Sequence, residues 1–114
     1  MNRDEASLLD INHAAGRIIR FASGLTKQEL AVNEEKQSAI LYQVIVVGEA
    51  AKRLSREFRD SHSIIPWKYI AGMRDILAHQ YDRVDINTLW DVVDNDIPEL
   101  LEMIKPLLPD SKNP

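Results

Sequence analysis

Residues 73–81 bring together four side chains that could act on a phosphate ester. Arg74 carries a permanently charged guanidinium whose donors fit phosphate or carboxylate oxygens. His79 carries an imidazole, the side chain best able to gain and lose a proton near neutral pH. Asp75 and Tyr81 add a carboxylate and a phenol in the same mostly apolar stretch. A fixed cation beside a proton-transferring group is what cleavage of a phosphodiester requires.

The spacing of Arg74 and His79 limits how they could share a site. On one α-helix, residues five positions apart lie about 140° apart around the axis, whereas Asp75 and His79, four positions apart, share a face. Either the helix ends before His79, or the site is built from two chains. A two-fold axis beside this stretch would bring two copies of Arg74 and two of His79 together. We therefore expect a symmetric homodimer.

The same stretch and its flanks carry a family resemblance. Arg74, His79 and Tyr81 form the pattern R-x4-H-x-Y. Three flanking stretches extend it, namely 48–55 (GEAAKRLS), 65–73 (IPWKYIAGM) and 89–93 (LWDVV). Over nearly its whole length the chain resembles the HepT-like toxins of the HEPN superfamily, also called DUF86, which belong to type VII toxin–antitoxin pairs. The flanks, more than the common Arg-x4-His spacing, carry this resemblance.

The resemblance implies a metal-independent endoribonuclease that acts as a toxin and needs no cofactor. Its catalytic residues would be Arg74 and His79, and a ribose 2′-hydroxyl would attack the neighbouring phosphate. Its partner would be an MntA-like nucleotidyltransferase antitoxin that neutralises it by transferring AMP to Tyr81. Asp75 stands where many superfamily members carry Asn, and a carboxylate near His79 would favour the imidazolium and so modulate the site.

Two other interpretations stay open from the sequence. The chain could be a non-catalytic HEPN helical module that binds substrate or nucleotide for a partner nucleotidyltransferase, which would use Arg74 without titrating His79. Arg74 could also form a structural ion pair with Asp75 or Glu49, in a protein of either function. A purely structural protein would leave the cluster of Arg74, His79 and Tyr81 unexplained.

The composition restricts the partners and the compartment. The 114 residues hold 14 Lys and Arg against 18 Asp and Glu, a net charge of −4, so any RNA contact must be local. The candidates for phosphate contacts are Lys52, Arg53 and Arg56, with Arg59 continuing the Lys52 and Arg56 row on one expected helix face. There is no cysteine, no signal pattern and no apolar run that could span a bilayer. We expect a cytoplasmic protein with an RNA substrate and no membrane or DNA partner.

No metal site is expected. The acidic residues Asp94, Asp96 and Glu99 resemble part of a calcium loop, but the loop's glycine is absent and Pro98 occupies a ligand position. The sequence also lacks a glycine-rich phosphate loop and any zinc-binding pattern.

The hydrophobic periodicity predicts an all-α fold, an up-and-down bundle of about four helices plus a short helix. The segments expected to be helical are 4–24, a short 26–33 opened by a Thr26–Glu29 capping box, 34–60, a helix starting at Pro66, and one from Asp85 to 107 with a kink at Pro98. Residues 1–109 should form a single HEPN-like domain, followed by a disordered tail, 110–114.

A few positions carry more specific expectations. Gly48 lies inside the longest segment, where glycine costs about 1 kcal/mol relative to alanine, so we expect a close helix contact there. Trp67 and Trp90 lie at core spacing. His13 and His62 have no polar neighbours of the kind that surround His79, and we expect both on the solvated surface.

Overall fold

A computed structural model describes residues 2–78 and 85–109, and for residues 75–78 it describes the helical backbone only. His79, Tyr81 and the expected tail, 110–114, lie outside the described residues. The described elements are all helical, which confirms the predicted all-α class. They are α1 (Arg3–Ala22), α2 (Lys27–Ala31), α3 (Glu34–Arg53), α4 (Arg56–Ser61), α5 (Trp67–Ala78), α6 (Ile86–Asp91), η1 (Val92–Asp96), α7 (Ile97–Ile104) and η2 (Lys105–Leu107).

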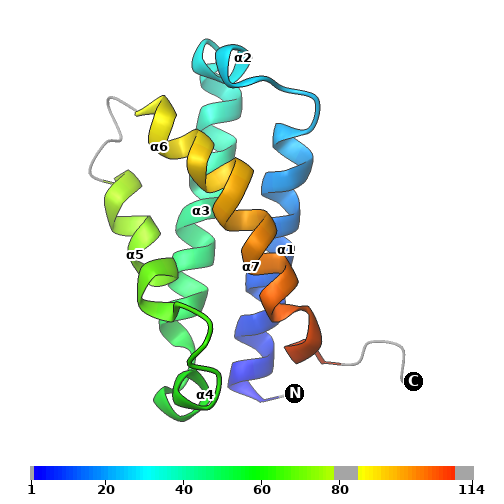
Figure 1. Ribbon diagram of the computed structural model, residues 1–114, viewed down its shortest axis with the longest axis vertical. Helices are drawn as coiled ribbons and strands as arrows, with labels where there is room; N and C mark the ends of the chain where they lie inside the picture. The colour runs from blue at the N-terminus through cyan, green and yellow to red at the C-terminus, as the bar shows by residue number, and fades with distance from the viewer. Residues whose placement is uncertain (1, 79–84, 110–114) are drawn as a thin grey trace.

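The long helices run in alternating directions, as predicted for an up-and-down bundle (Figure 1). α3 packs against α1 on one side and against α5 on the other. The unit formed by α6, η1 and α7 runs back obliquely across the bundle, and α7 packs on α1. α2 and α4 lie at opposite ends (Figure 1). None of the described helices has the length and apolar character needed to span a membrane.

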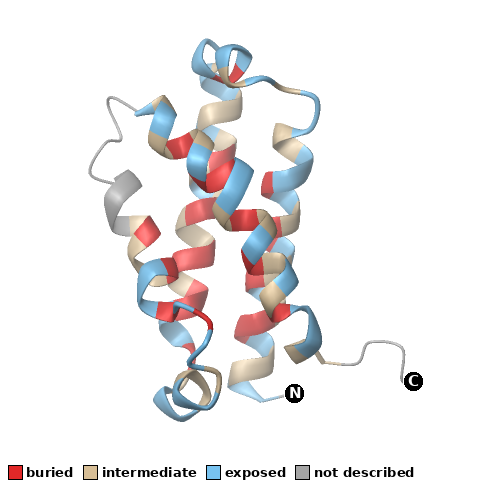
Figure 2. Ribbon diagram, viewed as in Figure 1, coloured by how far each residue is buried: buried red, intermediate tan, exposed pale blue. Residues whose placement is uncertain are grey.

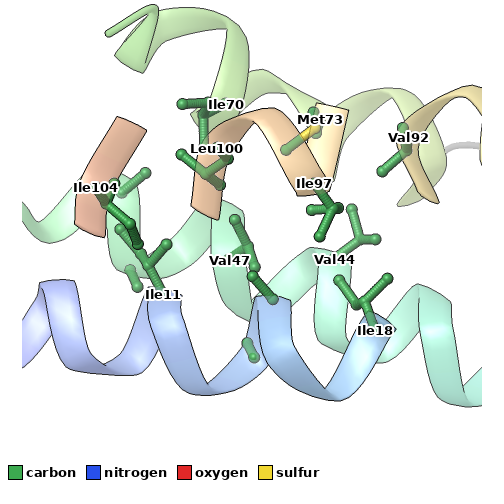
Figure 3. Packing of buried hydrophobic residues seen from close by; sticks show 14 of the residues in the cluster. Ile11, Ile18, Val44, Val47, Ile70, Met73, Val92, Ile97, Leu100 and Ile104 are labelled. Atoms are coloured by element: carbon green, nitrogen blue, oxygen red, sulfur yellow. The ribbon is translucent and has the colours of Figure 1, made fainter. Parts of the chain in front are cut away.

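The hydrophobic core lies where the long helices meet. Figure 2 shows the buried residues along their facing sides, and Figure 3 shows side chains from these helices converging on a common centre. Those labelled in Figure 3 are at most 4% exposed: Ile11, Ile18, Val44, Val47, Ile70, Met73, Val92, Ile97, Leu100 and Ile104. Burying each such side chain is worth about 1.5–3 kcal/mol, so this core fixes α5 against α3 and α7.

The helix ends at the N-terminal half follow their capping signals. Asn2 and Glu5 form a capping box at the start of α1. Gly24 adopts a φ of +79°, which favours glycine, and α1 ends two residues earlier at Ala22. The predicted capping box of the short helix is confirmed, because Thr26 accepts from the Glu29 N–H at 3.1 Å and Glu29 accepts from the Thr26 N–H at 2.8 Å.

The prediction of one helix over residues 34–60 is wrong. Leu54 leaves the helix with an extended ψ of 141° while its side chain stays buried. Ser55 then caps α4 by accepting from the N–H of Phe58 at 3.0 Å. The carboxylate of Asp4 accepts from the Ser55 N–H and from its hydroxyl, each at 2.7 Å. A serine that finds partners outside the helix offers the backbone an alternative that apolar spacing does not reveal.

The last long helix is continuous but irregular before Pro98. Pro98 has no N–H to donate, and the preceding turn, η1, is π-helical. There the N–H of Ile97 donates to the carbonyl of Val92, five residues back. The irregularity expected at Pro98 is therefore a π-helical turn directly before it. Asp85, at the predicted start of the last helix, caps α6 by accepting from the Asn87 N–H at 2.9 Å.

The aromatic and histidine expectations are partly confirmed. Trp67 is a core residue, 5% exposed, and Trp90 is half-buried. His13 is exposed, as predicted. The prediction for His62 is wrong, because its ring lies 4.5 Å from that of Phe58 and the side chain is half-buried.

Candidate active site

Arg74 lies at the edge of the core-facing side of α5. That side consists of Trp67, Ile70 and Met73, each at most 5% exposed. Arg74 directly follows Met73, and one residue of an α-helix turns the side chain by about 100°. The core therefore anchors α5 while the Arg74 side chain stays 30% exposed.

Glu49 of α3 holds the Arg74 guanidinium. Nη1 of Arg74 donates to Oε1 of Glu49, which confirms one of the two ion pairs left open by the sequence. The two side chains are 30% and 42% exposed, so the pair holds the guanidinium at the surface of the bundle and does not bury it. A partly exposed pair of this kind contributes little to stability, and its main effect is to orient the arginine.

Gly48 permits the close approach of α5 to α3 at this point. A Cβ on Gly48 would lie 2.8 Å from the Cβ of Arg74 and 3.2 Å from the carbonyl oxygen of Ala71. Neither neighbour is the flexible end of a side chain, so the helices would have to move apart. The predicted close contact is confirmed, and it is made with Arg74 itself. Two consecutive residues of α3, Gly48 and Glu49, thus determine where the guanidinium lies.

The remaining motif residues are predictions of the sequence alone. His79 and Tyr81 lie outside the described residues, as does the side chain of Asp75. The described part of α5 reaches Ala78, the residue before His79. A helix that ends before His79 and a site shared by two chains both stay predictions.

The three basic residues expected to contact phosphates do not share one helix. α3 ends at Arg53, and Arg56 is the first residue of α4, so the expected single row on a continuous helix is wrong. Arg53 forms an ion pair with Asp10 of α1 at 3.0 Å. Arg56 lies 3.8 Å from Asp60 and is 90% exposed. Lys52 is exposed near the end of α3. Their contacts with RNA stay a prediction.

A hydrogen bond connects α5 to η1, and it could not be predicted from the sequence. The hydroxyl of Tyr69 donates to a carboxylate oxygen of Asp96. This hydrogen bond, together with partial burial, raises the pKa of Tyr69 to about 12. The two residues are far apart in the sequence, and no local spacing links them. The bond helps to set α5 against the last helix, and so to position Arg74.

Comparison with known proteins decides the family. A family model described as "Ribonuclease HepT-like" matches residues 11–107. The chain belongs to the HepT-like family. The match includes the whole of α3 and α5, and with them Gly48, Glu49 and Arg74. The resemblance carried by the R-x4-H-x-Y pattern and its flanks is therefore confirmed.

Individual relatives match over most of their length. The chain is 36% identical over 95 residues to a protein of Caldanaerobacter subterraneus subsp. tengcongensis named "Putative RNase", covering 83% of this chain and 85% of that protein. It is 36% identical over 93 residues to a "Probable ribonuclease HepT" of Thermococcus cleftensis, covering 82% and 84%. A "Putative RNase" of Methanocaldococcus jannaschii is 34% identical over 112 residues, covering 95% and 93%. No solved structure matches the chain.

Proposed function

We propose that this HepT-like protein is a metal-independent endoribonuclease and the toxin of a toxin–antitoxin pair. The observation that carries the proposal is the Arg74 guanidinium, which Glu49 holds at the surface of the bundle five residues before His79. A guanidinium oriented by a carboxylate is suited to bind a phosphate, because it loses little conformational freedom when the phosphate arrives. The family description and the names of the relatives support RNA as the substrate.

Cleavage would proceed by transesterification. The ribose 2′-oxygen attacks the adjacent phosphorus, and its proton passes to the imidazole of His79. The bond from phosphorus to the 5′-oxygen breaks, that oxygen takes a proton from an acid, and the products are a 2′,3′-cyclic phosphate and a 5′-hydroxyl. Arg74 stabilises the non-bridging oxygens as their negative charge grows. Proton transfer of this kind contributes roughly 10²- to 10⁴-fold in rate.

A symmetric homodimer would supply both proton-transferring groups. Two chains that meet near the motif bring two copies of His79 to one cleft, so that one accepts a proton and the other donates one. Asp75, four residues before His79, would favour the imidazolium form and thus the acid role. The cleft would then be incomplete without the second chain.

In this proposal the second chain packs on an apolar surface of α3, two turns before the Arg74–Glu49 ion pair. Tyr42 lies seven residues before Glu49, which is two turns along the same face of α3, and it is 64% exposed. Ile45 and Val46, between them on that side, are half-buried. An exposed aromatic residue flanked by aliphatic ones is typical of a protein interface.

The antitoxin in this proposal is a nucleotidyltransferase that modifies Tyr81. The phenol oxygen attacks the α-phosphorus of ATP, pyrophosphate leaves, and Tyr81 gains an adenylyl group. The new group adds bulk and negative charge two residues from His79. It would repel and obstruct an incoming RNA phosphate.

Incubation of the purified protein with RNA in EDTA tests the proposal. The expected result is RNA fragments with 2′,3′-cyclic phosphate ends, which disappear in His79→Ala and in Arg74→Ala. Circular dichroism and melting temperatures should show both variants to be folded. Intact RNA that is nevertheless bound would favour the rival function, a non-catalytic module that presents substrate or nucleotide to a nucleotidyltransferase. Cleavage that stops in EDTA and returns with Mg²⁺ would contradict metal independence.

A further inference from the structure

An open groove with basic walls lies between α4 and the start of α5. Its volume is about 440 Å³, and its polar lining comes from Arg56, Arg59, Asp60, Ser63 and Lys68. Three cations thus face one carboxylate, in a chain whose net charge is −4. Such a local excess of positive charge attracts an anion despite the acidic character of the whole protein.

Two of the cations are not neutralised within the described part of the chain. The Nε atom of Arg59 is buried and has no hydrogen-bond partner there. The single carboxylate, Asp60, lies 3.8 Å from Arg56, and both side chains are largely exposed. Lys68 is exposed in the first turn of α5, where the helix dipole is positive. An anion in the groove would therefore meet the positive charges of Arg59 and Lys68, for which the described residues supply no carboxylate partner.

The lining fits a phosphodiester backbone better than a free nucleotide. Arginine forks match phosphate oxygens, and lysine adds a mobile point charge. A nucleotide base would also need an aromatic face, but Trp67 is 5% exposed and its Nε1 already donates to the carbonyl of His62 at 3.1 Å. The groove therefore offers contacts to phosphates and no platform for a base.

We propose that Arg59 and Lys68, assisted by Arg56, bind phosphates of the RNA strand whose cleaved phosphate lies at Arg74. The proposal rests on the proposed ribonuclease function. α5 connects the two places, because Lys68 and Arg74 are six residues apart on it, about 9 Å along the helix axis and about 120° apart around it. A strand that leaves the groove would therefore have to turn part of the way around α5 for its neighbouring nucleotides to reach Arg74.

Salt-dependent RNA binding tests this subsite in the His79→Ala background, which removes cleavage. The probe is a fluorescent single-stranded RNA of about 20 nucleotides, measured by fluorescence anisotropy at several salt concentrations. Each phosphate contact on single-stranded nucleic acid adds about 0.7 to the slope of log K against log salt. The double variant Arg59→Gln/Lys68→Gln should therefore lower that slope by about 1.4. The charge-preserving pair Arg59→Lys/Lys68→Arg should keep most of it.

The matched control is Arg17→Gln/Arg20→Gln, which removes two exposed cations of α1. An equal loss of slope in both double variants would overturn the subsite, since it would indicate general electrostatic attraction. An unchanged slope in Arg59→Gln/Lys68→Gln would overturn it as well, and so would groove-dependent binding of ATP without RNA. If the Arg59 change prevents folding, Lys68→Gln alone should still lower the slope by about 0.7.

The cleavage assay separates this proposal from the proposed function. RNA that binds through Arg59 and Lys68 and is not cut by the wild-type protein would contradict the nuclease while leaving the groove intact. RNA that is cut with the same kcat/KM by the wild type and by Arg59→Gln/Lys68→Gln would contradict the groove while leaving the nuclease intact.

Discussion

At the residue scale, the Arg74–Glu49 ion pair connects the sequence motif to the fold. Arg74 could be singled out from the sequence because a guanidinium and an imidazole recur at a family spacing, and Glu49 could be named as one of two partners. That Glu49 pairs with Arg74 could not be predicted, because the pair depends on how α3 and α5 pack. The close contact of Gly48 with Arg74 fixes that packing. The cost of a glycine inside a helix predicted that Gly48 makes a close helix contact, but it did not predict that Arg74 is the partner.

Replacing Glu49 tests whether the pair positions Arg74 for catalysis. Glu49→Gln removes the charge that orients the guanidinium while it keeps the side-chain shape. A misplacement of about 1 Å can cost about 10²-fold in rate, so RNA cleavage should fall by roughly 10- to 100-fold. The melting temperature should change little, because the pair is partly exposed. The measurement is the initial rate of cleavage under single-turnover conditions.

Glu102→Gln is the control, because Glu102 is exposed on α7 and the substitution removes the same charge. Its cleavage rate should equal that of the wild type. A Glu49→Gln variant that cleaves faster than the wild type would show instead that Glu49 competes with the substrate for Arg74.

At the scale of the elements, close packing of α3 on α5 and the break between α3 and α4 shape the site. The helical segments could be predicted from their apolar periodicity and caps, as the Thr26–Glu29 capping box shows. The break at Ser55 could not be predicted, because it depends on the hydrogen bonds of Ser55 to Asp4, a residue that is distant in the sequence. The groove lined by Arg59 and Lys68 follows from that break.

Gly48→Ala tests the helix contact. Overpacking a tight contact costs about 1–3 kcal/mol, against a gain of about 1 kcal/mol in helix propensity, so the net effect should be a loss of stability. RNA cleavage should fall too, because α5 carries Arg74. Gly16→Ala is the control, since nothing lies within 4 Å of a Cβ built there. It should be neutral or stabilising in thermal unfolding, and equal melting temperatures for the two variants would refute the close contact.

The bond between α1 and α4 predicts a dependence of stability on pH. The N–H and hydroxyl of Ser55 donate to Asp4 and hold the pKa of that carboxyl below its usual value of 3.8. The carboxylate therefore stabilises the folded state above pH 3.8, and this stabilisation is lost as the pH falls through the lower pKa of the folded protein.

Asp4→Asn should consequently be less stable than the wild type at pH 7, and the difference should shrink in acid. Urea unfolding at neutral pH and near pH 3 measures it, with the exposed Asp94→Asn as the control. A difference between wild type and Asp4→Asn that stays constant with pH would contradict the role of this carboxylate.

At the scale of the whole molecule, a bundle with a net charge of −4 carries a local excess of positive charge at the groove between α4 and α5. The net charge and the all-α class could be predicted from composition and periodicity. The surfaces could not, because they depend on which residues the fold leaves exposed. The Tyr42 surface and the Arg59–Lys68 groove are both of this kind.

Tyr42→Glu tests the proposed dimer surface. A charge at this 64% exposed position should leave the fold unchanged and destabilise the association of two chains. Light scattering during size-exclusion chromatography should give about 13.0 kDa for the variant and twice that for the wild type. The control is Val32→Glu, which changes an 84% exposed apolar residue at the end of α2. This variant should remain a dimer. Equal masses for Tyr42→Glu and the wild type would show that Tyr42 is not part of a dimer interface.

The most direct test of the shared site mixes two inactive chains. Arg74→Ala and His79→Ala homodimers should each fail to cut RNA, and exchange of subunits between them forms a dimer that retains one guanidinium and one imidazole. We predict that cleavage partly reappears after exchange, in proportion to the mixed dimer measured by native mass spectrometry. Its rate per dimer should stay below that of the wild type, because only one of the two imidazoles is left to transfer a proton. A mixture that contains the mixed dimer and cuts no more RNA than its two parents would contradict a site built from both chains.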